Sequence, residues 1–373
     1  MDDDVKVSEV VSDSVEKWLS TKDSPVTTGV TEDYNRFIHR KIIFMIICIV
    51  MIFVVVGYAL TVGGYDIAFF DCYRIIWDHF FGTIDDVTKD YVIMKVRLPR
   101  LAVGICAGCG LAMAGVVMQS ILKNPLADPY TTGVSSGALF GATLAMALSV
   151  GLVNRYVIVM DAFVFSLIPT LVIIMVAKIK NASPTVMIMS GIAVMYIFNA
   201  CTTVLKLMMD PNSLASIYEW QVGSLTLANW DDIPIMAVTV LIGWIVLQAL
   251  TRTLNKMNAG DDSARSMGVN VETVRIACLV VVAVMSAIIV SFTGLIGFVG
   301  LVSPHIARIF ISSDNRFLLP ASALFGAALL LIADFVGRTI IAPATLQVGV
   351  IMAFIGGPMF LWLIAKRNSK VWG

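Results

Sequence analysis

The apolar run over residues 101–122 constrains the fold of this chain more than any other stretch. It is about 20 residues long, which is the length that one helix needs to cross a bilayer. A helix that faces lipid gains nothing from many small residues, whereas a helix surrounded by other helices gains close approach of their backbones. Small residues cover most of the circumference of this run: Gly104, Ala107, Gly108, Gly110, Ala112, Ala114 and Gly115. We therefore predict that residues 101–122 form the central helix of a packed bundle.

The next apolar segment repeats this pattern of small residues. Gly133, Gly137 and Gly141 are four residues apart, so they share one face of a helix. The polar turn NPLADP separates the two segments, and Asn124 ends the first because a residue before proline leaves the α region. The residues predicted to let helices pack closely are Gly104, Gly108, Gly133, Gly137 and Gly141.

Nine further apolar segments of helical length accompany the central one. With 58% hydrophobic and 14% charged residues and a mean hydropathy of +0.88, the chain departs strongly from the composition of soluble proteins. The fold class is therefore predicted to be an all-α polytopic membrane protein of about ten transmembrane helices. The predicted spans are 42–62, 101–122, 134–152, 156–179, 186–209, 233–250, 276–292, 295–311, 320–341 and 348–365.

The flanks of these spans predict topology and domain organisation. Arg36, Arg40 and Lys41 precede the first span, which places the N-terminus in the cytoplasm, and an even number of spans returns the C-terminus there. Residues 1–40 are predicted to be a cytoplasmic tail with a short amphipathic helix near residues 7–19. Residues 41–368 are predicted to be the transmembrane domain, with its largest polar loop at about 252–275.

Several kinds of chemistry have no motif in this sequence. There is no GxxxxGK[ST] phosphate-binding loop, no HExxH pair and no nucleophile elbow, so we expect no catalytic residues, and the three histidines predict no metal site. An ion-coupled secondary transporter would need ionisable groups near the midplane of the membrane. Acidic residues are scarce in the predicted spans, so the sequence does not favour this class of membrane protein. We expect Met113, Met118 and Gln119 to line a path for a bulky, already chelated cargo.

Six motifs carry a family resemblance. They occur in the order RLPR (97–100), NPLADP (124–129), TTGVSSGA (131–138), GLIGFVGLVSPHIAR (294–308), ADFVGR (333–338) and IGGPMFLWLI (355–364). With them the chain closely resembles, over about residues 40–366, the FecCD-type permeases of ABC importers for iron-siderophore, haem and cobalamin. The resemblance implies a type II importer permease that translocates a ferric siderophore by alternating access. Cobalamin or another corrinoid, haem and molybdate are the alternative cargoes.

The same resemblance implies the partners. These are a second copy of the chain, two ABC ATPase subunits that hold ATP and magnesium, an extracytoplasmic substrate-binding protein and the bilayer of a prokaryotic cytoplasmic membrane, with no nucleic acid. No cofactor is expected on this chain itself.

Three arginines lie at predicted outer helix ends, against the usual charge bias. In the family that RLPR and ADFVGR resemble, such arginines meet glutamates of the binding protein, which implies docking by Arg97, Arg100 and Arg338. The alternative is that each reaches the membrane interface, or that Arg338 pairs with Asp334 one turn earlier.

The resemblance also implies an ATPase-coupling segment and a gate. Gly260 and Gly268 bracket DDSARSM within the 252–275 loop, and an aspartate there can cap a short helix. The candidate coupling residues are Gly260, Asp261, Asp262, Ala264, Arg265 and Gly268. The candidate gate residues are Leu126, Pro184 and Thr185.

Overall fold

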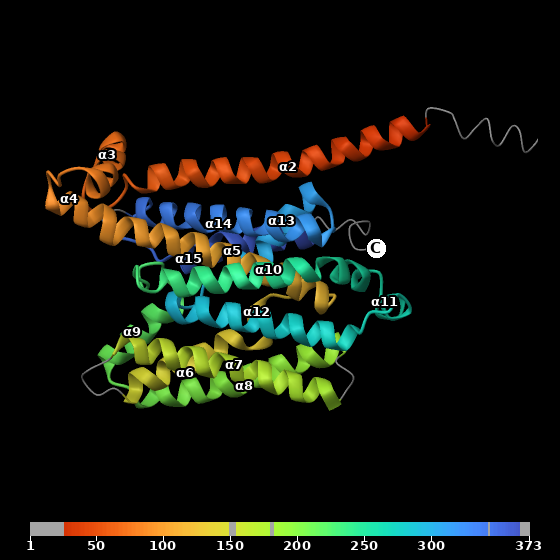
Figure 1. Cartoon of the computed structure of the whole chain (residues 1–373). Coiled ribbons are helices and arrows are strands. Elements are labelled where there is room, and N and C mark those ends of the chain that lie inside the picture. The colour runs from red at the N-terminus through yellow and green to blue at the C-terminus, as the bar shows by residue number, and fades with distance from the viewer. Residues whose placement is uncertain (1–25, 149–153, 180–182, 342–343, 366–373) are drawn as a thin grey trace, which may run out of the picture. The chain divides into compact units, whose positions relative to one another are not determined.

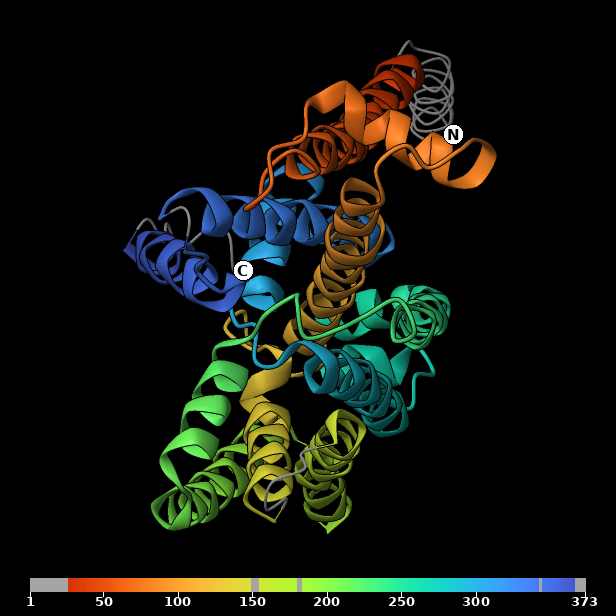
Figure 2. The ribbon, with the colours of Figure 1, turned by 90° about the vertical axis from the view of Figure 1, so that its left-hand side faces the viewer.

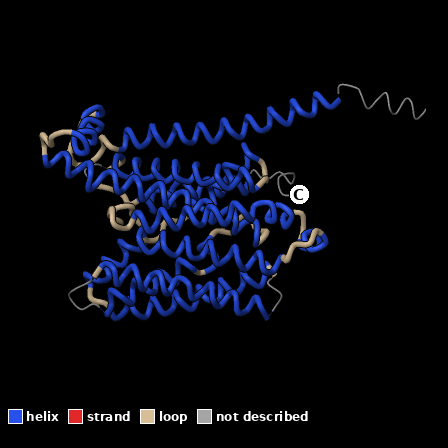
Figure 3. The backbone as a smooth tube through the Cα atoms, viewed as in Figure 1, coloured by secondary structure: helices blue, strands red, loops and turns tan. Residues whose placement is uncertain are grey.

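The computed structural model describes residues 26–148, 154–179, 183–341 and 344–365, and within these residues it contains helices and no strand (Figure 3). This confirms the predicted all-α class. The helices in chain order are α2 (Val26–Ala59), α3 (Phe69–Phe81), α4 (Val87–Tyr91), the π-helical segment η1 (Val92–Arg97), α5 (Leu98–Ile121), the short 3₁₀ turn η2 (Pro129–Thr132), α6 (Val134–Leu148), α7 (Arg155–Ile179), α8 (Pro184–Met208), α9 (Pro211–Val222), α10 (Ile233–Asn258), α11 (Asp261–Ser266), α12 (Val271–Thr293), α13 (Val299–Ile311), α14 (Asn315–Thr339) and α15 (Val348–Ala365).

The chain divides into two compact units, residues 1–44 and 45–373, and their boundary lies within α2. The helix begins at Val26, although the sequence placed residues 26–40 in a polar tail. The amphipathic helix predicted near residues 7–19 lies outside the described residues.

Each of the ten predicted spans has a helical counterpart. In the described part of the chain, seven helices are long and apolar enough to cross a membrane: Ile38–Ala59, Val87–Ile121, Arg155–Ile179, Pro184–Met208, Ile233–Asn258, Val271–Thr293 and Asn315–Thr339. Three shorter apolar helices, Val134–Leu148, Val299–Ile311 and Val348–Trp362, correspond to the remaining three. The chain is a multi-span membrane protein.

Helix α5 lies at the centre of the second unit and is buried along most of its length. It packs against α10, α12, α13 and α14, while α6, α7 and α8 pack against one another (Figure 1). A Cβ atom on Gly108 would lie 2.6 Å from Ala327 Cα, and one on Gly115 would lie 1.7 Å from the carbonyl oxygen of Gly300. Backbones therefore touch at these glycines, which agrees with the prediction of a central packed helix.

Two of the three glycines in the second series, Gly137 and Gly141, also let helices pack closely, whereas Gly133 has another role. A Cβ atom would lie 2.3 Å from Phe165 O at Gly137 and 2.2 Å from Asp161 O at Gly141, so α6 and α7 meet there. Gly133, however, precedes α6 and has a φ of +84°, so it ends the turn η2 rather than sharing a helical face. A left-handed backbone suits glycine, which has no Cβ penalty there.

The short helices mark the two ends of the bundle formed by the long helices. Helices α3, α4 and α9 lie at one end, called here the α3 end, and α11 lies at the opposite, α11 end (Figure 1). Figure 2 looks onto the α3 end.

Candidate functional site

A short helix at the α11 end is set off from its neighbours by two glycines. Gly260 and Gly268 have φ angles of +123° and +78°, so the chain turns sharply on either side of α11. Gly260 itself is the N-cap, and Asp261 and Asp262 form the first turn with no side-chain cap. The expectation that one of these aspartates caps the helix was therefore wrong, although acids remain favourable near the positive end of the helix dipole.

Asp261 connects α11 to the end of α5. Its carboxylate lies 2.8 Å from Lys123 Nζ, and it accepts hydrogen bonds of 3.0 and 3.1 Å from Nη2 of Arg275. The Arg275 side chain is only 2% exposed, and its Nε donates to the carbonyl oxygen of Ile121 at 2.8 Å. One buried guanidinium therefore joins three elements: α11, α12 and the last turn of α5.

The charge of Asp261 is stabilised by these bonds. Burial alone would raise the pKa of the Asp261 carboxyl, but hydrogen bonds and positive charge from Lys123 and Arg275 outweigh it, and the pKa lies below its usual value. The link is thus ionic at neutral pH. Sequence reasoning missed the role of Arg275, and its only signal was a single arginine just before the long apolar part of α12.

The other side of α11 is open. The Asp262 side chain is fully exposed, and that of Arg265 is 59% exposed, whereas Ala264 is buried. A shallow groove beside the helix is lined by Arg265, Gly268, Val269, Asn270, Val271 and Glu272. Helix α11 therefore presents a polar surface outward and is attached to the bundle inward.

A second set of arginines surrounds a buried carboxylate toward the α3 end. Asp334 is fully buried in α14; Arg100 on α5 contacts it at 2.7 Å, and Arg338, one turn later, contacts it at 3.1 Å. The pairing of Arg338 with Asp334 is the one that the sequence offered as an alternative. Two cations thus share one carboxylate between α5 and α14.

Main-chain carbonyl groups accept hydrogen bonds from two arginines of this set, Arg338 and Arg97. Arg338 Nη1 donates to the oxygens of Ala59 (2.9 Å) and Val62 (3.0 Å). Arg97 is 4% exposed and donates to the oxygens of Leu60 and Tyr65. The burial of both arginines argues against a free basic rim, so docking by Arg97, Arg100 and Arg338 stays a prediction. What the geometry gives directly is a clamp on the turn after α2.

The residues expected at the gate and along the path behave differently from one another. Leu126 is exposed in the turn after α5, Pro184 opens α8, and Thr185 is exposed beside it; their role as a gate stays a prediction. Met113, Met118 and Gln119 are buried, with 1%, 0% and 5% of their surface exposed. The side-chain oxygen of Gln119 accepts a hydrogen bond from Arg308 Nη2 at 3.0 Å. The expectation that Met113, Met118 and Gln119 line a path was wrong, because α5 is covered on these sides by its neighbours.

The relatives of this chain agree with this architecture. The model of the FecCD transport family matches residues 39–366. An ABC transporter permease protein of Methanocaldococcus jannaschii, MJ0087, is 41% identical over 92% of this chain and 99% of its own length. The hemin transport system permease protein HmuU of Yersinia pestis is 32% identical over 90% and 99%.

A cobalamin permease and a solved structure extend these similarities. The cobalamin import system permease protein BtuC of Halobacterium salinarum is 38% identical over 76% of each chain. A metal-chelate type ABC transporter solved in an inward-facing conformation superposes with a TM-score of 0.76 at 28% identity, covering 87% of this chain and 99% of that one. A family match over most of the chain, together with relatives of this identity and coverage, shows that the protein belongs to the FecCD transport family of ABC transporter permeases.

Proposed function

We propose that this chain is the permease subunit of an ABC importer that carries a chelated iron compound, with a ferric siderophore as the first choice. Relatives named for hemin and Fe(3+)-citrate transport support this cargo class, and the cobalamin permease keeps a corrinoid as the main alternative. Haem and molybdate are further alternatives. ATP and magnesium would be bound by separate ATPase subunits, because this chain has no phosphate-binding loop.

The observation that carries the proposal is the link from α11 through Asp261 and Arg275 to the last turn of α5. A permease driven by another subunit needs an exposed element that this subunit can push and an inward connection that carries the push to the core. Helix α11 has both: Asp262 and Arg265 face outward, and Asp261 faces the buried guanidinium. Movement of α11 would thus reach the central helix through hydrogen bonds rather than through a mobile loop.

The distribution of charge supports an orientation with the α11 end in the cytoplasm. Cytoplasmic ends carry an excess of lysine and arginine. Basic residues flank the helices at this end: Lys123, Lys178, Arg252, Lys256, Arg265, Arg275, Arg308 and Arg316. Residues 69–91 at the α3 end carry five aspartates against one arginine and one lysine. The N-terminus would then be cytoplasmic as well.

Docking of a binding protein would take place at the α3 end. A broad cleft there is lined by the turn after α2 and by α14: Thr61, Val62, Gly63, Gly64, Asp66, Ile67, Ala68, Arg338, Thr339 and Thr345. Within the proposal, Arg338 borders this cleft, while Arg97 and Arg100 hold the elements behind it. A second copy of the chain would complete the translocation path at the axis between the two copies.

One experiment separates the function from the cargo. The complex of two permeases, two ATPases and binding protein is reconstituted in proteoliposomes, and ATP hydrolysis is measured with binding protein carrying ferric siderophore, haem, cobalamin or molybdate. Stimulation and uptake that are largest with ferric siderophore support the full proposal. A larger response to another cargo replaces the cargo only, and no response to any of them would overturn the importer function.

The coupling role is tested in the same assay with Arg265→Glu. Reversal of this exposed charge should reduce the stimulated ATP hydrolysis, because it alters the surface that meets the ATPase. The matched control is Lys178→Glu, an equally simple reversal of an exposed charge at the same end, on α7. Equal effects of the two changes would show that α11 has no special role.

A further inference from the structure

Helix α3 lies across the ends of the long helices rather than along them. Figure 1 shows it transverse to α5 and α14, and in Figure 2, which looks onto this end, it is seen from the side. A helix in this position is parallel to the plane of the membrane that the long helices cross. The proposed function leaves α3 without a task.

The three sides of α3 differ in chemistry. The inward side carries Cys72, Ile75 and Ile76, which pack into a core cluster with Leu60, Ile93, Met94, Leu101 and Leu331, and Cys72 Sγ donates to Leu60 O at 3.3 Å. The second side is charged, with Asp71, Arg74 and Asp78. The third side is aromatic and open: Phe70 is 82% exposed, Trp77 64%, Phe80 65% and Phe81 75%.

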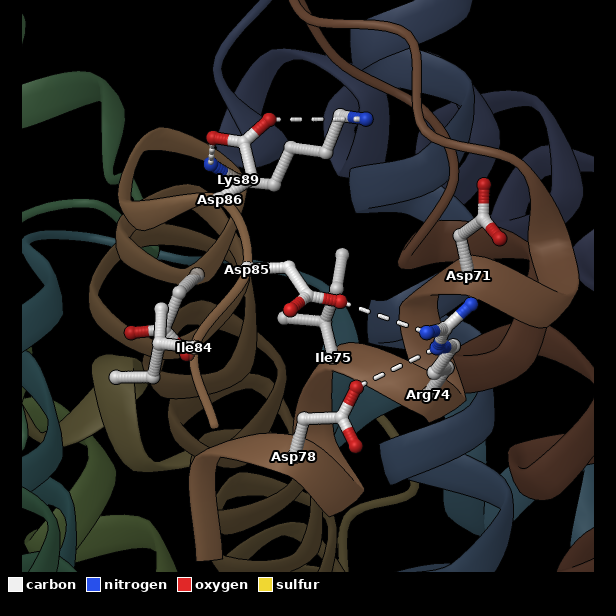
Figure 4. A pocket seen from close by; sticks show the side chains of 9 residues that line it. Asp71, Arg74, Ile75, Asp78, Ile84, Asp85, Asp86 and Lys89 are labelled. Carbon is white, nitrogen blue, oxygen red and sulfur yellow. Dashed lines mark hydrogen bonds and ion pairs between the residues drawn. The ribbon is translucent and has the colours of Figure 1, made fainter. Parts of the chain in front are cut away.

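The charged side has its own ion pairs and does not cover the aromatic side. Arg74 contacts Asp78 and Asp85 at 3.4 Å each, across the pocket of Figure 4. His79 Nδ1 lies 2.8 Å from Asp90 at the end of α4, and Asp86 caps α4 by accepting from the backbone of Thr88 and Lys89. These contacts hold α3 and α4 together, so the aromatic side is fixed in orientation rather than free to rotate inward.

The aromatic side is continuous with the outer surface of a membrane-crossing helix. The rings of Tyr58 in α2 and Phe69 in α3 are 5.7 Å apart, and those of Phe69 and Tyr73 are 5.2 Å apart. A Cβ atom on Gly57 would lie 2.8 Å from Tyr73 Oη, so α3 packs directly on the last turns of α2. In those turns Phe53 and Tyr58 are 71% and 59% exposed, and they belong to a helix that is long and apolar enough to cross a membrane and only 22% buried, as expected of a lipid-facing span.

We propose that α3 is an interfacial helix whose aromatic side lies in the boundary between headgroups and acyl chains of the leaflet at the α3 end. Its occupant is lipid, because the surface that α3 extends is itself a lipid-facing surface. Tryptophan and tyrosine favour this depth, where an apolar ring body and a polar group are both satisfied. The aspartates of residues 69–91 disfavour anionic headgroups, so the helix suits a zwitterionic surface.

The helix has a mechanical consequence for the bundle. It is attached by its inward side to the cluster that contains Leu101 of α5 and Leu331 of α14. Binding of α3 in the interface would therefore fix the position of the α3 end along the membrane normal while the α11 end moves. This role concerns the membrane and holds whatever cargo the importer carries.

The test measures the depth of Trp77. The full chain is placed in phosphatidylcholine nanodiscs, and the emission of Trp77 is obtained as the difference between the parent protein and Trp77→Phe, a conservative change that preserves the fold. Lipids with a nitroxide near the ester end of the acyl chain should quench this emission at least about twice as strongly as lipids with a nitroxide near the methyl end, because such helices bury their apolar face only about 5–10 Å. Aqueous iodide should quench it weakly.

The matched control places a tryptophan on the charged side, as Asp71→Trp in the Trp77→Phe background. Its emission should show the reverse pattern, with strong quenching by iodide and weak quenching by lipid nitroxides. The proposal is overturned if Trp77 is quenched by iodide and not by lipid, which would place it in water. Protection of Trp77 from both quenchers, in the chain alone or only after addition of binding protein, would also overturn it by showing a protein occupant.

Discussion

The two ends of α5 are both held by arginines, but in opposite ways. Toward the α3 end, Arg100 meets Asp334, a carboxylate with no exposure, between two long helices whose backbones touch at Gly108. At the α11 end, Arg275 meets Asp261, whose side chain is 25% exposed and which belongs to a helix of six residues. An arginine–aspartate pair thus holds one end of α5 against another long helix, and a second such pair connects the other end to a short, accessible helix.

The difference teaches where this fold can move. Removing one partner of a buried ion pair costs about 3–5 kcal/mol, because a charge stays behind without compensation, whereas exposed pairs contribute about 0–1 kcal/mol. We therefore expect the Arg100–Asp334 pair, called here the outer clamp, to stabilise the fold, and the Arg275–Asp261 pair, called here the inner link, to transmit movement of α11 to α5. Four predictions test this contrast, beginning with the largest effect.

The contrast requires α5 to be rigid between its ends. Gly115→Leu should therefore have the largest effect, because even a Cβ atom would lie 1.7 Å from Gly300 O, a backbone atom that cannot move aside. Overpacking of this kind costs about 1–3 kcal/mol or more, and here we expect loss of folded protein in detergent, measured by size-exclusion chromatography. Gly104→Ala is the control, since its Cβ would meet only side-chain ends of Leu331 and Leu225. Equal tolerance of both changes would mean that α5 is not tightly packed.

Asp334→Asn tests the outer clamp. The change leaves Arg100 and Arg338 buried near one another without a counter-charge, so we expect a loss of about 3–5 kcal/mol in the free energy of unfolding. Thermal unfolding in detergent measures it, with the exposed Asp262→Asn as control. An unfolding temperature as high as that of the parent would show that the negative charge of Asp334 does not stabilise the fold.

Asp261→Asn tests the inner link and should separate stability from coupling. Its carboxylate is partly exposed and the asparagine oxygen can still accept from the buried Arg275, so we expect a smaller stability loss than for Asp334→Asn, about 1–3 kcal/mol. Stimulation of ATP hydrolysis by loaded binding protein should nevertheless fall severalfold, because the charged bond from α11 to the buried Arg275 is replaced by a weaker, neutral one. Lys123→Met, which removes the other partner but keeps Arg275, should cause a smaller fall. Full stimulation in Asp261→Asn would remove the link from the proposed mechanism.

The smallest effect on stability is expected for Asp314, the residue that caps the N-terminus of α14 at the α11 end. Burial would raise the pKa of its carboxyl, but hydrogen bonds from Arg316 and Asn255 lower it to about 2. The folded-state pKa lies below the unfolded one, so this stabilisation is complete above about pH 4 and is lost as the pH falls toward 2. The difference in unfolding temperature between parent and Asp314→Asn should therefore shrink over this interval. A difference that stays constant down to the lowest pH would contradict the assignment.

Much of the fold could be predicted because it depends on local composition. Ten apolar segments gave ten helices, and the small residues of 101–122 gave the central one. Glycines at 260 and 268 marked α11 because only their backbone freedom permits the turns on either side. The start of α2 at Val26 was missed, since a polar helix without an apolar stripe leaves no periodic signal.

The site depended on contacts that local sequence does not contain. Arg100 and Asp334 are 234 positions apart, and the acceptors of Arg97 and Arg338 are carbonyl groups, which every residue has. Met113, Met118 and Gln119 were misassigned because hydropathy identifies a span but does not say which of its sides meets another helix. A helix that is buried on all sides is apolar on all sides, so its sequence does not distinguish residues that line a path from residues that pack in the core.

The use of carbonyl oxygens by Arg97 and Arg338 has a consequence for sequence variation. Because the bonds go to the main chain of residues 59–65, they survive replacement of Thr61, Val62 or Tyr65 by other residues, provided that the backbone keeps its course. The two arginines can thus stay constant while the surface of the turn diversifies. A library that randomises these positions should yield many folded variants, each with a different surface on an unchanged backbone.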